Sequence, residues 1–197
     1  AVVVDDATYA AIPAAVDAYV KAVGNDVREG VLVVDKWHHP DSIKAELVKL
    51  YSEQALEGAV FIGEIPIPML RDAQHFATAF KMFQHRNWLD SSIPSDRFYD
   101  DFDLKFDYIK QDTTNRLAHY YSLRADSPQE ICCDIYSARI KAPNKDGKAH
   151  ELIEAYLKKA VEAHKNPERM DNILHFAGHG YNSDAMNARI DEASALR

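Results

Sequence analysis

Two histidines and two glycines stand close together near the end of the chain, in the stretch HFAGHG over residues 175–180. The apolar residues before it are typical of a buried strand, and Gly178 and Gly180 would let the backbone turn sharply where that strand ends. His179 would then be exposed at the edge of the sheet, where an imidazole can act as a general acid or base near neutral pH. His175 is expected to remain in the core. Taken alone, the stretch fits an ordinary glycine turn, a catalytic histidine or a metal ligand.

A second stretch, SDRFYDDFD over residues 95–103, is rich in carboxylates. Its acidic residues are Asp96, Asp100, Asp101 and Asp103. Three interpretations are open. The stretch can be a solvent-exposed acidic loop, because clustered charges usually lie on the surface. It can be a calcium site, since this hard cation prefers several carboxylate oxygens. It can also be an acidic pocket for an Arg or Lys side chain.

The only cysteines are the neighbours Cys132 and Cys133, in the apolar run EICCDIYSARI. Adjacent cysteines rarely bond to each other, and two thiols make no disulfide framework. Nothing cationic lies close to them in the sequence, so a catalytic thiolate is disfavoured. We therefore expect buried thiols, one on each side of a strand.

The composition is that of a globular domain. The 197 residues are 47% hydrophobic, which is enough for one sizeable core, and we expect a single domain. Acidic residues outnumber basic ones by 31 to 23, which argues against nucleic-acid binding and favours a basic partner or substrate. Since no run of 18 apolar residues occurs, we expect no membrane span.

The first 65 residues alternate between strand and helix patterns. Apolar runs predict buried strands at 2–5, 30–36 and 58–64, with a helix from Ile12 to Val23 between the first two. A second helix follows, which Asp41 or Ser42 could cap. This order predicts a parallel sheet with helices on both faces.

The rest of the chain is less regular. The prolines of IPIPML (65–70) exclude a central strand, because proline lacks the amide donor that a sheet ladder requires. Beyond them we expect a helix over 72–88, an irregular loop over 89–94, a hairpin joined through TTNR, a core strand in CCDIYSARI, a helix over 148–165 and a final strand before Gly178.

Four short motifs follow one another along the chain: the strand end at Gly63, Ser95-Asp96 with Tyr99, the strand end Ala138-Arg139-Ile140, and Gly178-His179-Gly180. In their order and spacing they resemble the catalytic domain of gingipain-like cysteine peptidases of the caspase clan, over roughly residues 30–184. The last motif is also similar to the histidine segment of CHAT domains, which are relatives in the same clan. The resemblance implies an α/β fold, a caspase-like three-layer α/β/α sandwich with a mostly parallel central sheet.

The resemblance also implies roles for individual residues. His179 would be the general base and acid, Gly180 would contribute to the oxyanion pocket, and Asp90 is a candidate for orienting the histidine. Asp96 and Asp100 would contribute to a substrate pocket, with a preference for Arg or Lys before the scissile bond. Asp96, Asp101 and Asp103 would hold a structural calcium ion, and no other cofactor is required.

In that family the nucleophilic cysteine follows the histidine, whereas no cysteine follows His179 here. We therefore expect residues 1–197 to be one incomplete caspase-like catalytic domain. The nucleophile would lie beyond Arg197 or on a second chain processed from the same precursor. The alternatives are a catalytically inactive caspase-like interaction domain, and a metal-assisted hydrolase that uses His175 and His179. A protein or peptide substrate is expected, and only the resemblance favours a secreted, periplasmic or cell-surface location.

Overall fold

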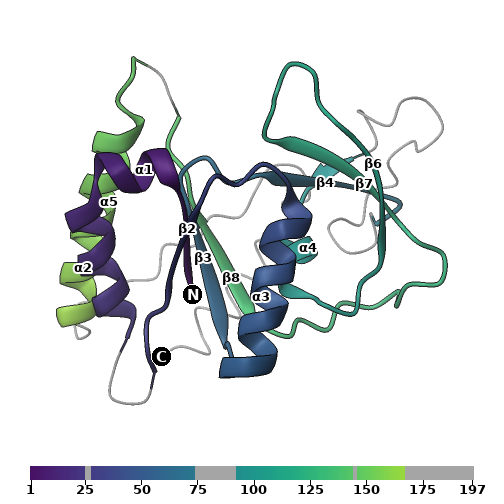
Figure 1. The fold of residues 1–197 in the computed structure, drawn as a ribbon, viewed down its shortest axis with the longest axis horizontal. Helices are drawn as coiled ribbons and strands as arrows, with labels where there is room; N and C mark the ends of the chain where they lie inside the picture. The colour runs from purple at the N-terminus through teal and green to yellow at the C-terminus, as the bar shows by residue number, and fades with distance from the viewer. Residues whose placement is uncertain (25–27, 74–91, 144–145, 167–197) are drawn as a thin grey trace, which may run out of the picture. The chain divides into compact units, whose positions relative to one another are not determined.

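The computed structural model describes residues 1–24, 28–73, 92–143 and 146–166. The chain divides into two compact units, residues 1–161 and 162–197, and the architecture below is that of the first. Two four-stranded sheets form this unit (Figure 1). None of the helices in the described ranges is long and apolar enough to cross a membrane.

The first sheet is wholly parallel, and its strand order is β2-β1-β3-β8. Its strands are β1 (Val2–Asp5), β2 (Leu32–Asp35), β3 (Gly58–Ile62) and β8 (Tyr136–Ile140). Strands β2 and β3 lie on opposite sides of β1, so the chain adds β2 on one side of β1 and then crosses to add β3 on the other. The predicted parallel α/β sheet is confirmed.

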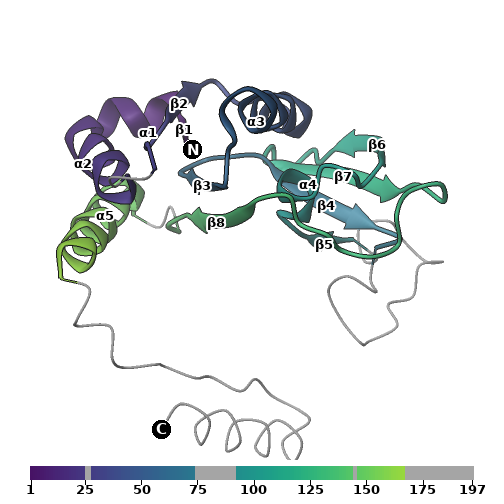
Figure 2. The same ribbon diagram turned by 90° about the horizontal axis from the view of Figure 1, so that it is seen from below.

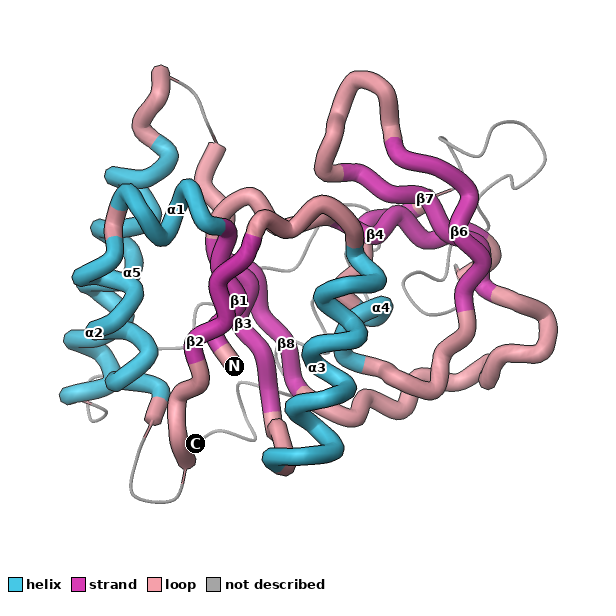
Figure 3. The backbone as a smooth tube through the Cα atoms, viewed as in Figure 1, coloured by secondary structure: helices cyan, strands magenta, loops and turns pink. Residues whose placement is uncertain are grey.

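Helices pack on both faces of this sheet because successive strand residues point to opposite sides. On one face, Val2, Val4 and Ile62 contact helix α2 (Pro13–Val23) and helix α5 (Ala149–Lys165). On the other face, Val3 and Phe61 contact helix α3 (Pro40–Gln54). Figure 3 shows the sheet between these two groups of helices. The short helix α1 (Asp6–Ala11) begins directly after β1.

The second sheet has the order β5-β4-β7-β6 and mixes parallel and antiparallel pairs. Its strands are β4 (Ile67–Arg71), β5 (Ile93–Pro94), β6 (Phe106–Gln111) and β7 (Ala118–Leu123). The hairpin predicted through TTNR is confirmed as the antiparallel pair β6–β7. One turn of helix, α4 (Arg97–Asp100), lies between β5 and β6 in the chain (Figure 2).

The prediction that IPIPML could not form a central strand is wrong. Strand β4 contains Pro68 and lies between β5 and β7. The amide of the preceding residue, Ile67, donates to Leu117 on the β7 side, whereas the Pro68 carbonyl accepts from Ser95 on the β5 side. Since the amide and carbonyl of one residue point to the same side of a strand, the missing proline amide faces the short strand β5 and not β7. The pairing of β4 with β7 therefore runs without interruption from Ile67 to Arg71.

Two expectations about the first βαβ units also need correction. The cap of α3 is His39 rather than Asp41 or Ser42, and Pro40 occupies the first helical position, where its missing amide costs nothing. Strand β2 is at the edge of the sheet and is only partly covered, with Val34 36% exposed. Its apolar run is typical of a central, buried strand, but among the described strands β2 pairs with β1 alone, and its second half is exposed.

The cysteines are exposed and not buried, so that prediction is wrong too. Strand β8 starts at Tyr136, and both thiols lie in the irregular segment that precedes it. Ile93 and Pro94 form β5 where an irregular loop was expected. The rest of that loop, the predicted helix from residue 74 onward and the predicted final strand lie outside the described residues.

Candidate functional site

The side chain of Arg139, on strand β8, joins three segments that are far apart in the sequence. Its Nη2 and Nε atoms donate to the two carboxylate oxygens of Asp96 over 2.7 and 3.0 Å. Its Nη1 and Nη2 atoms also donate to the backbone carbonyls of Ile65 and Pro66, over 2.8 and 3.0 Å. The guanidinium carbon lies 5.5 Å from the centre of the Phe61 ring. Five donors in a planar fork suit this arrangement, which a lysine could not reproduce.

Two further hydrogen bonds complete this junction. The Tyr99 hydroxyl, fully buried, donates to the Pro66 carbonyl over 2.9 Å, and burial raises the pKa of this phenol well above its ordinary value. The Gly63 amide donates to the Ile140 carbonyl over 3.0 Å. Gly63, the Ser95-Asp96/Tyr99 motif and the Ala138-Arg139-Ile140 motif are therefore held in one connected set of contacts, which we call the motif junction.

Gly63 follows the last residue of β3 and lies against Asp5, the last residue of β1. It has φ +88°, and a Cβ placed on it would lie 2.1 Å from Asp5 Oδ2 and 2.4 Å from Thr8 Oγ1. Asp5 accepts from the Thr8 amide over 2.9 Å and from the Glu64 amide over 2.8 Å. Its carboxylate thus caps α1 and fixes the chain that leaves β3. Ligands of α/β proteins usually bind at this edge of a parallel sheet, and here β1, β3 and β8 all end.

Asp100 is completely buried below this junction. Its Oδ2 accepts a hydrogen bond from the Ser137 hydroxyl and lies 2.8 Å from Arg97 Nη2. Burial nevertheless raises the pKa of the carboxyl, because removal from water outweighs the hydrogen bond and the positive charge. The same guanidinium contacts the sulfur of Cys133 through Nη1.

The remaining acidic residues of the segment differ in environment. Asp101 is buried, and its Oδ2 accepts from the Cys132 amide over 2.8 Å. Its backbone carbonyl accepts from Lys44 Nζ over 3.0 Å. Asp103 is exposed. Within the described ranges, no group of three or more His, Cys, Asp or Glu residues is arranged to hold a metal ion. The calcium site at Asp96, Asp101 and Asp103 stays a prediction.

The structure gives both predicted substrate-binding acids a partner within the chain. Asp96 is paired with Arg139 and its side chain is 22% exposed, whereas Asp100 is paired with Arg97 and has no exposed surface. A basic substrate side chain would have to displace these arginines. The substrate role of the two acids stays a prediction with that requirement attached. The three predicted catalytic residues, Asp90, His179 and Gly180, lie outside the described residues.

Sequence reasoning did not foresee the contact between Arg97 and Cys133, which are 36 residues apart in the chain. The arginine nearest in space to the thiol is thus remote in sequence. Partial removal from water and the neighbouring Asp100 carboxylate together raise the pKa of Cys133 above its ordinary value, although the guanidinium lowers it. That this thiol is not a catalytic thiolate stays a prediction, although a cation that the sequence did not reveal lies beside it.

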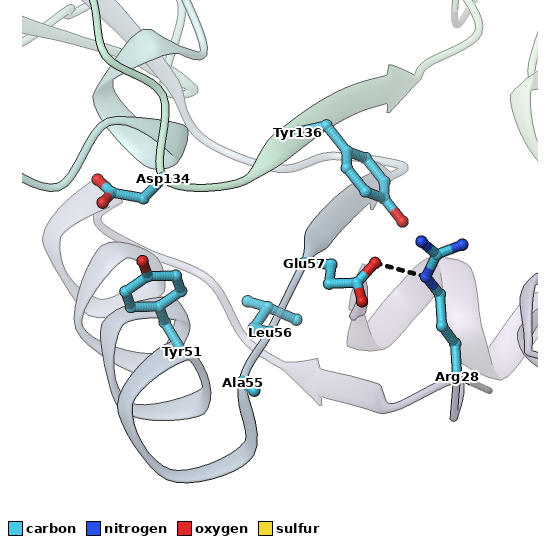
Figure 4. Close-up of a pocket in the computed structure, with 7 residues that line it drawn as sticks. All are labelled: Arg28, Tyr51, Ala55, Leu56, Glu57, Asp134 and Tyr136. Carbon is cyan, nitrogen blue, oxygen red and sulfur yellow. Dashed lines mark hydrogen bonds and ion pairs between the residues drawn. The ribbon is translucent and has the colours of Figure 1, made fainter.

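A pocket of about 660 Å³ lies at the opposite edge of the parallel sheet, beside the amino ends of β3 and β8 (Figure 4). Its lining includes an ion pair between Arg28 and Glu57 and two exposed rings, Tyr51 and Tyr136. Asp134 adds a second carboxylate, whose Oδ2 accepts from the Phe102 amide over 2.7 Å. The pocket is therefore polar and aromatic, and it lies away from the strand ends that form the motif junction.

Comparison of the chain with models of known protein families, with curated proteins and with solved structures gave no match. The class that the structure itself defines is an α/β protein with a mostly parallel sheet.

Proposed function

We propose that this chain is the histidine-bearing part of a cysteine endopeptidase with a caspase-like three-layer α/β/α fold. The observation that supports the proposal is the motif junction. Three of the four motifs that resemble gingipain-like peptidases are separated by tens of residues, yet their members are joined by direct hydrogen bonds. Short motifs that occur by chance have no reason to meet in space.

In the proposed reaction, His179 takes the proton of a cysteine thiol, and the thiolate attacks the carbonyl carbon of the scissile peptide bond. The Gly180 amide stabilises the oxyanion that forms, and Asp90 orients the imidazole. The imidazolium then gives its proton to the leaving amine as the carbon–nitrogen bond breaks. Water hydrolyses the resulting thioester and regenerates the thiol. The nucleophile is supplied by polypeptide outside residues 1–197.

Substrate preference follows from the acidic segment. Asp96 and Asp100 would bind an Arg or Lys side chain once Arg139 or Arg97 has turned away from them. The Asp96 carboxylate is the more accessible of the two, since its side chain is 22% exposed and that of Asp100 has no exposed surface. Asp96, Asp101 and Asp103 would hold a structural calcium ion.

The test uses the complete gene product, with whatever sequence flanks this chain, and fluorogenic peptides that carry Arg, Lys or Leu before the scissile bond. His179→Ala should lower kcat/KM at least 100-fold. His38→Ala, at an exposed histidine between β2 and α3, is the matched control and should leave kcat/KM unchanged.

A peptidyl electrophile with Arg beside the warhead should label one cysteine, which sequencing of the labelled peptide will identify. Activity that survives His179→Ala would refute the proposal. Labelling of Cys132 or Cys133 would show that the nucleophile lies within this chain. Peptidase activity that is abolished by chelators and insensitive to the electrophile would instead support metal-assisted hydrolysis.

A further inference from the structure

His119, on strand β7, lies against the amino terminus of α3 in a cluster of rings that the proposed peptidase chemistry does not use. Its ring is edge-to-face with that of His39, the cap of α3, with centroids 4.9 Å apart and an interplanar angle of 74°. His39 also contacts Tyr108 of β6, with centroids 4.7 Å apart. The Tyr121 hydroxyl lies 3.5 Å from His39 Nδ1. The cluster joins the β6–β7 hairpin to α3.

The position of His119 suits only a neutral imidazole. The residue is 1% exposed, and neither ring nitrogen has a hydrogen-bond partner. Burial and, to a smaller extent, the neighbouring His39 lower the pKa of His119 to about 4, although Asp41 and the Arg116 backbone oppose the shift. A protonated ring here would bury two N–H donors that make no well-formed hydrogen bond in this structure, and only Asp41 and the Arg116 backbone favour the charged form.

No counter-charge is free to compensate a proton on His119. The groups that face it are His39 and Asp41 from α3 and Tyr108 from β6, while its partners in the sheet register, Gln111 and Pro68, are uncharged. Asp41 Oδ2 lies 2.9 Å from His39 Nδ1, so that carboxylate is matched to His39 when His39 is charged.

Strand β6 is the part of this interface that can yield. It is the outer strand of its sheet, and all its residues after Phe106 are exposed. A register shift between Tyr108 and Lys110 interrupts its pairing with β7. Strand β7 is instead an inner strand and is mostly buried. An exposed edge strand with an irregular ladder is the kind of segment that opens locally at low free energy.

We propose that His119 makes the pairing of strand β6 acid-sensitive, because the ring takes up a proton only when β6 separates from β7 and from the amino terminus of α3. This inference goes beyond the proposed peptidase function and does not depend on it.

The direction and size of the effect follow from linkage. The pKa of His119 is lowered from 6.5 in the open state to about 4 in the closed state, so opening is favoured as the pH falls below 6.5, and the effect levels off only below pH 4. Between pH 7 and pH 5 the equilibrium constant for opening should rise about 20-fold. Between pH 8 and pH 7 it should hardly change.

Native-state hydrogen exchange at pH 7 and pH 5, corrected for the intrinsic exchange rates, tests this proposal. Amides that pair β6 with β7 should lose protection about 20-fold on acidification, with little dependence on added urea, whereas exchange in β1 and β3 should depend steeply on urea. His119→Phe keeps a ring of similar shape without a proton site, and this variant should lose the acid effect. His38→Gln, at the exposed neighbouring histidine, should retain it.

Equal acid sensitivity in His119→Phe would overturn the proposal. So would hairpin amides that exchange with the same free energy and urea dependence as β1. If His119→Phe does not fold, the wild-type protein still tests the proposal. NMR titration of the His119 ring signals should give a value near 4, and a value near 6.5 would refute the argument.

Discussion

The substitution Gly63→Ala tests the geometry at the carboxyl ends of β1 and β3. Gly63 has φ +88°, which an L-residue adopts only with strain, and its Cβ would lie 2.1 Å from Asp5 Oδ2 and 2.4 Å from Thr8 Oγ1. Real Cβ atoms do not approach so closely, so the Asp5 carboxylate must move. That movement breaks at least one of its two hydrogen bonds to backbone amides, at Thr8 and Glu64.

The expected cost has two parts. Forcing alanine into this backbone conformation costs about 1–2 kcal/mol. Losing a hydrogen bond to a charged, buried carboxylate costs about 1.5–3 kcal/mol more. We therefore expect Gly63→Ala to lower the free energy of unfolding by about 3–5 kcal/mol, which is a large share of the stability of a small domain. Urea unfolding monitored by circular dichroism measures this loss.

Gly147 provides the matched control. It also has positive φ, +68°, but no atom lies within 4 Å of the position that its Cβ would take. Gly147→Ala should therefore cost only the backbone strain, about 1–2 kcal/mol. In an Asp5→Ala background the penalty of Gly63→Ala should also shrink, because the carboxylate is no longer in the way. Equal losses for Gly63→Ala and Gly147→Ala would refute the close approach that the structure shows.

Other predictions concern the helix core, the motif junction and the thiols. Leu157→Ala should lower the free energy of unfolding by about 2–5 kcal/mol because Leu157 is fully buried, whereas Leu152→Ala, at a residue on the same helix that is 50% exposed, should change it by less than about 0.5 kcal/mol. Arg139→Lys should cost about 2 kcal/mol in the same urea assay, since lysine keeps the charge but cannot donate to all the acceptors that the guanidinium holds. Cys132 and Cys133 should both react with a maleimide in the folded protein because both are exposed, and Cys133 should react more slowly than a free thiol at pH 7, since its pKa is raised. A single reacting thiol, or none, would contradict their exposure.

Much of the fold could be predicted from local pattern. Strand β1, helices α2 and α5 and the β6–β7 hairpin follow from apolar periodicity and turn residues, which are properties of neighbouring positions in the chain. The parallel sheet follows from the alternation of strands and helices. The prediction for IPIPML failed because the missing proline amide affects only one side of the strand, and at Pro68 that side faces the short strand β5. Which side of Pro68 faces β5, and how short β5 is, depends on distant residues.

The sequence by itself determined the order of the elements and marked the residues whose chemistry matters. Only the tertiary structure decided what those residues contact. Asp96 and Asp100 resemble free acids in the sequence, yet the folded chain pairs each with an arginine, and Arg139 comes from a strand more than 40 residues away from Asp96. His119 gives no sign in the sequence of its unpartnered, buried position beside His39. Charge pairing and burial depend on which segments meet in space, and spacing along the chain does not specify those distances.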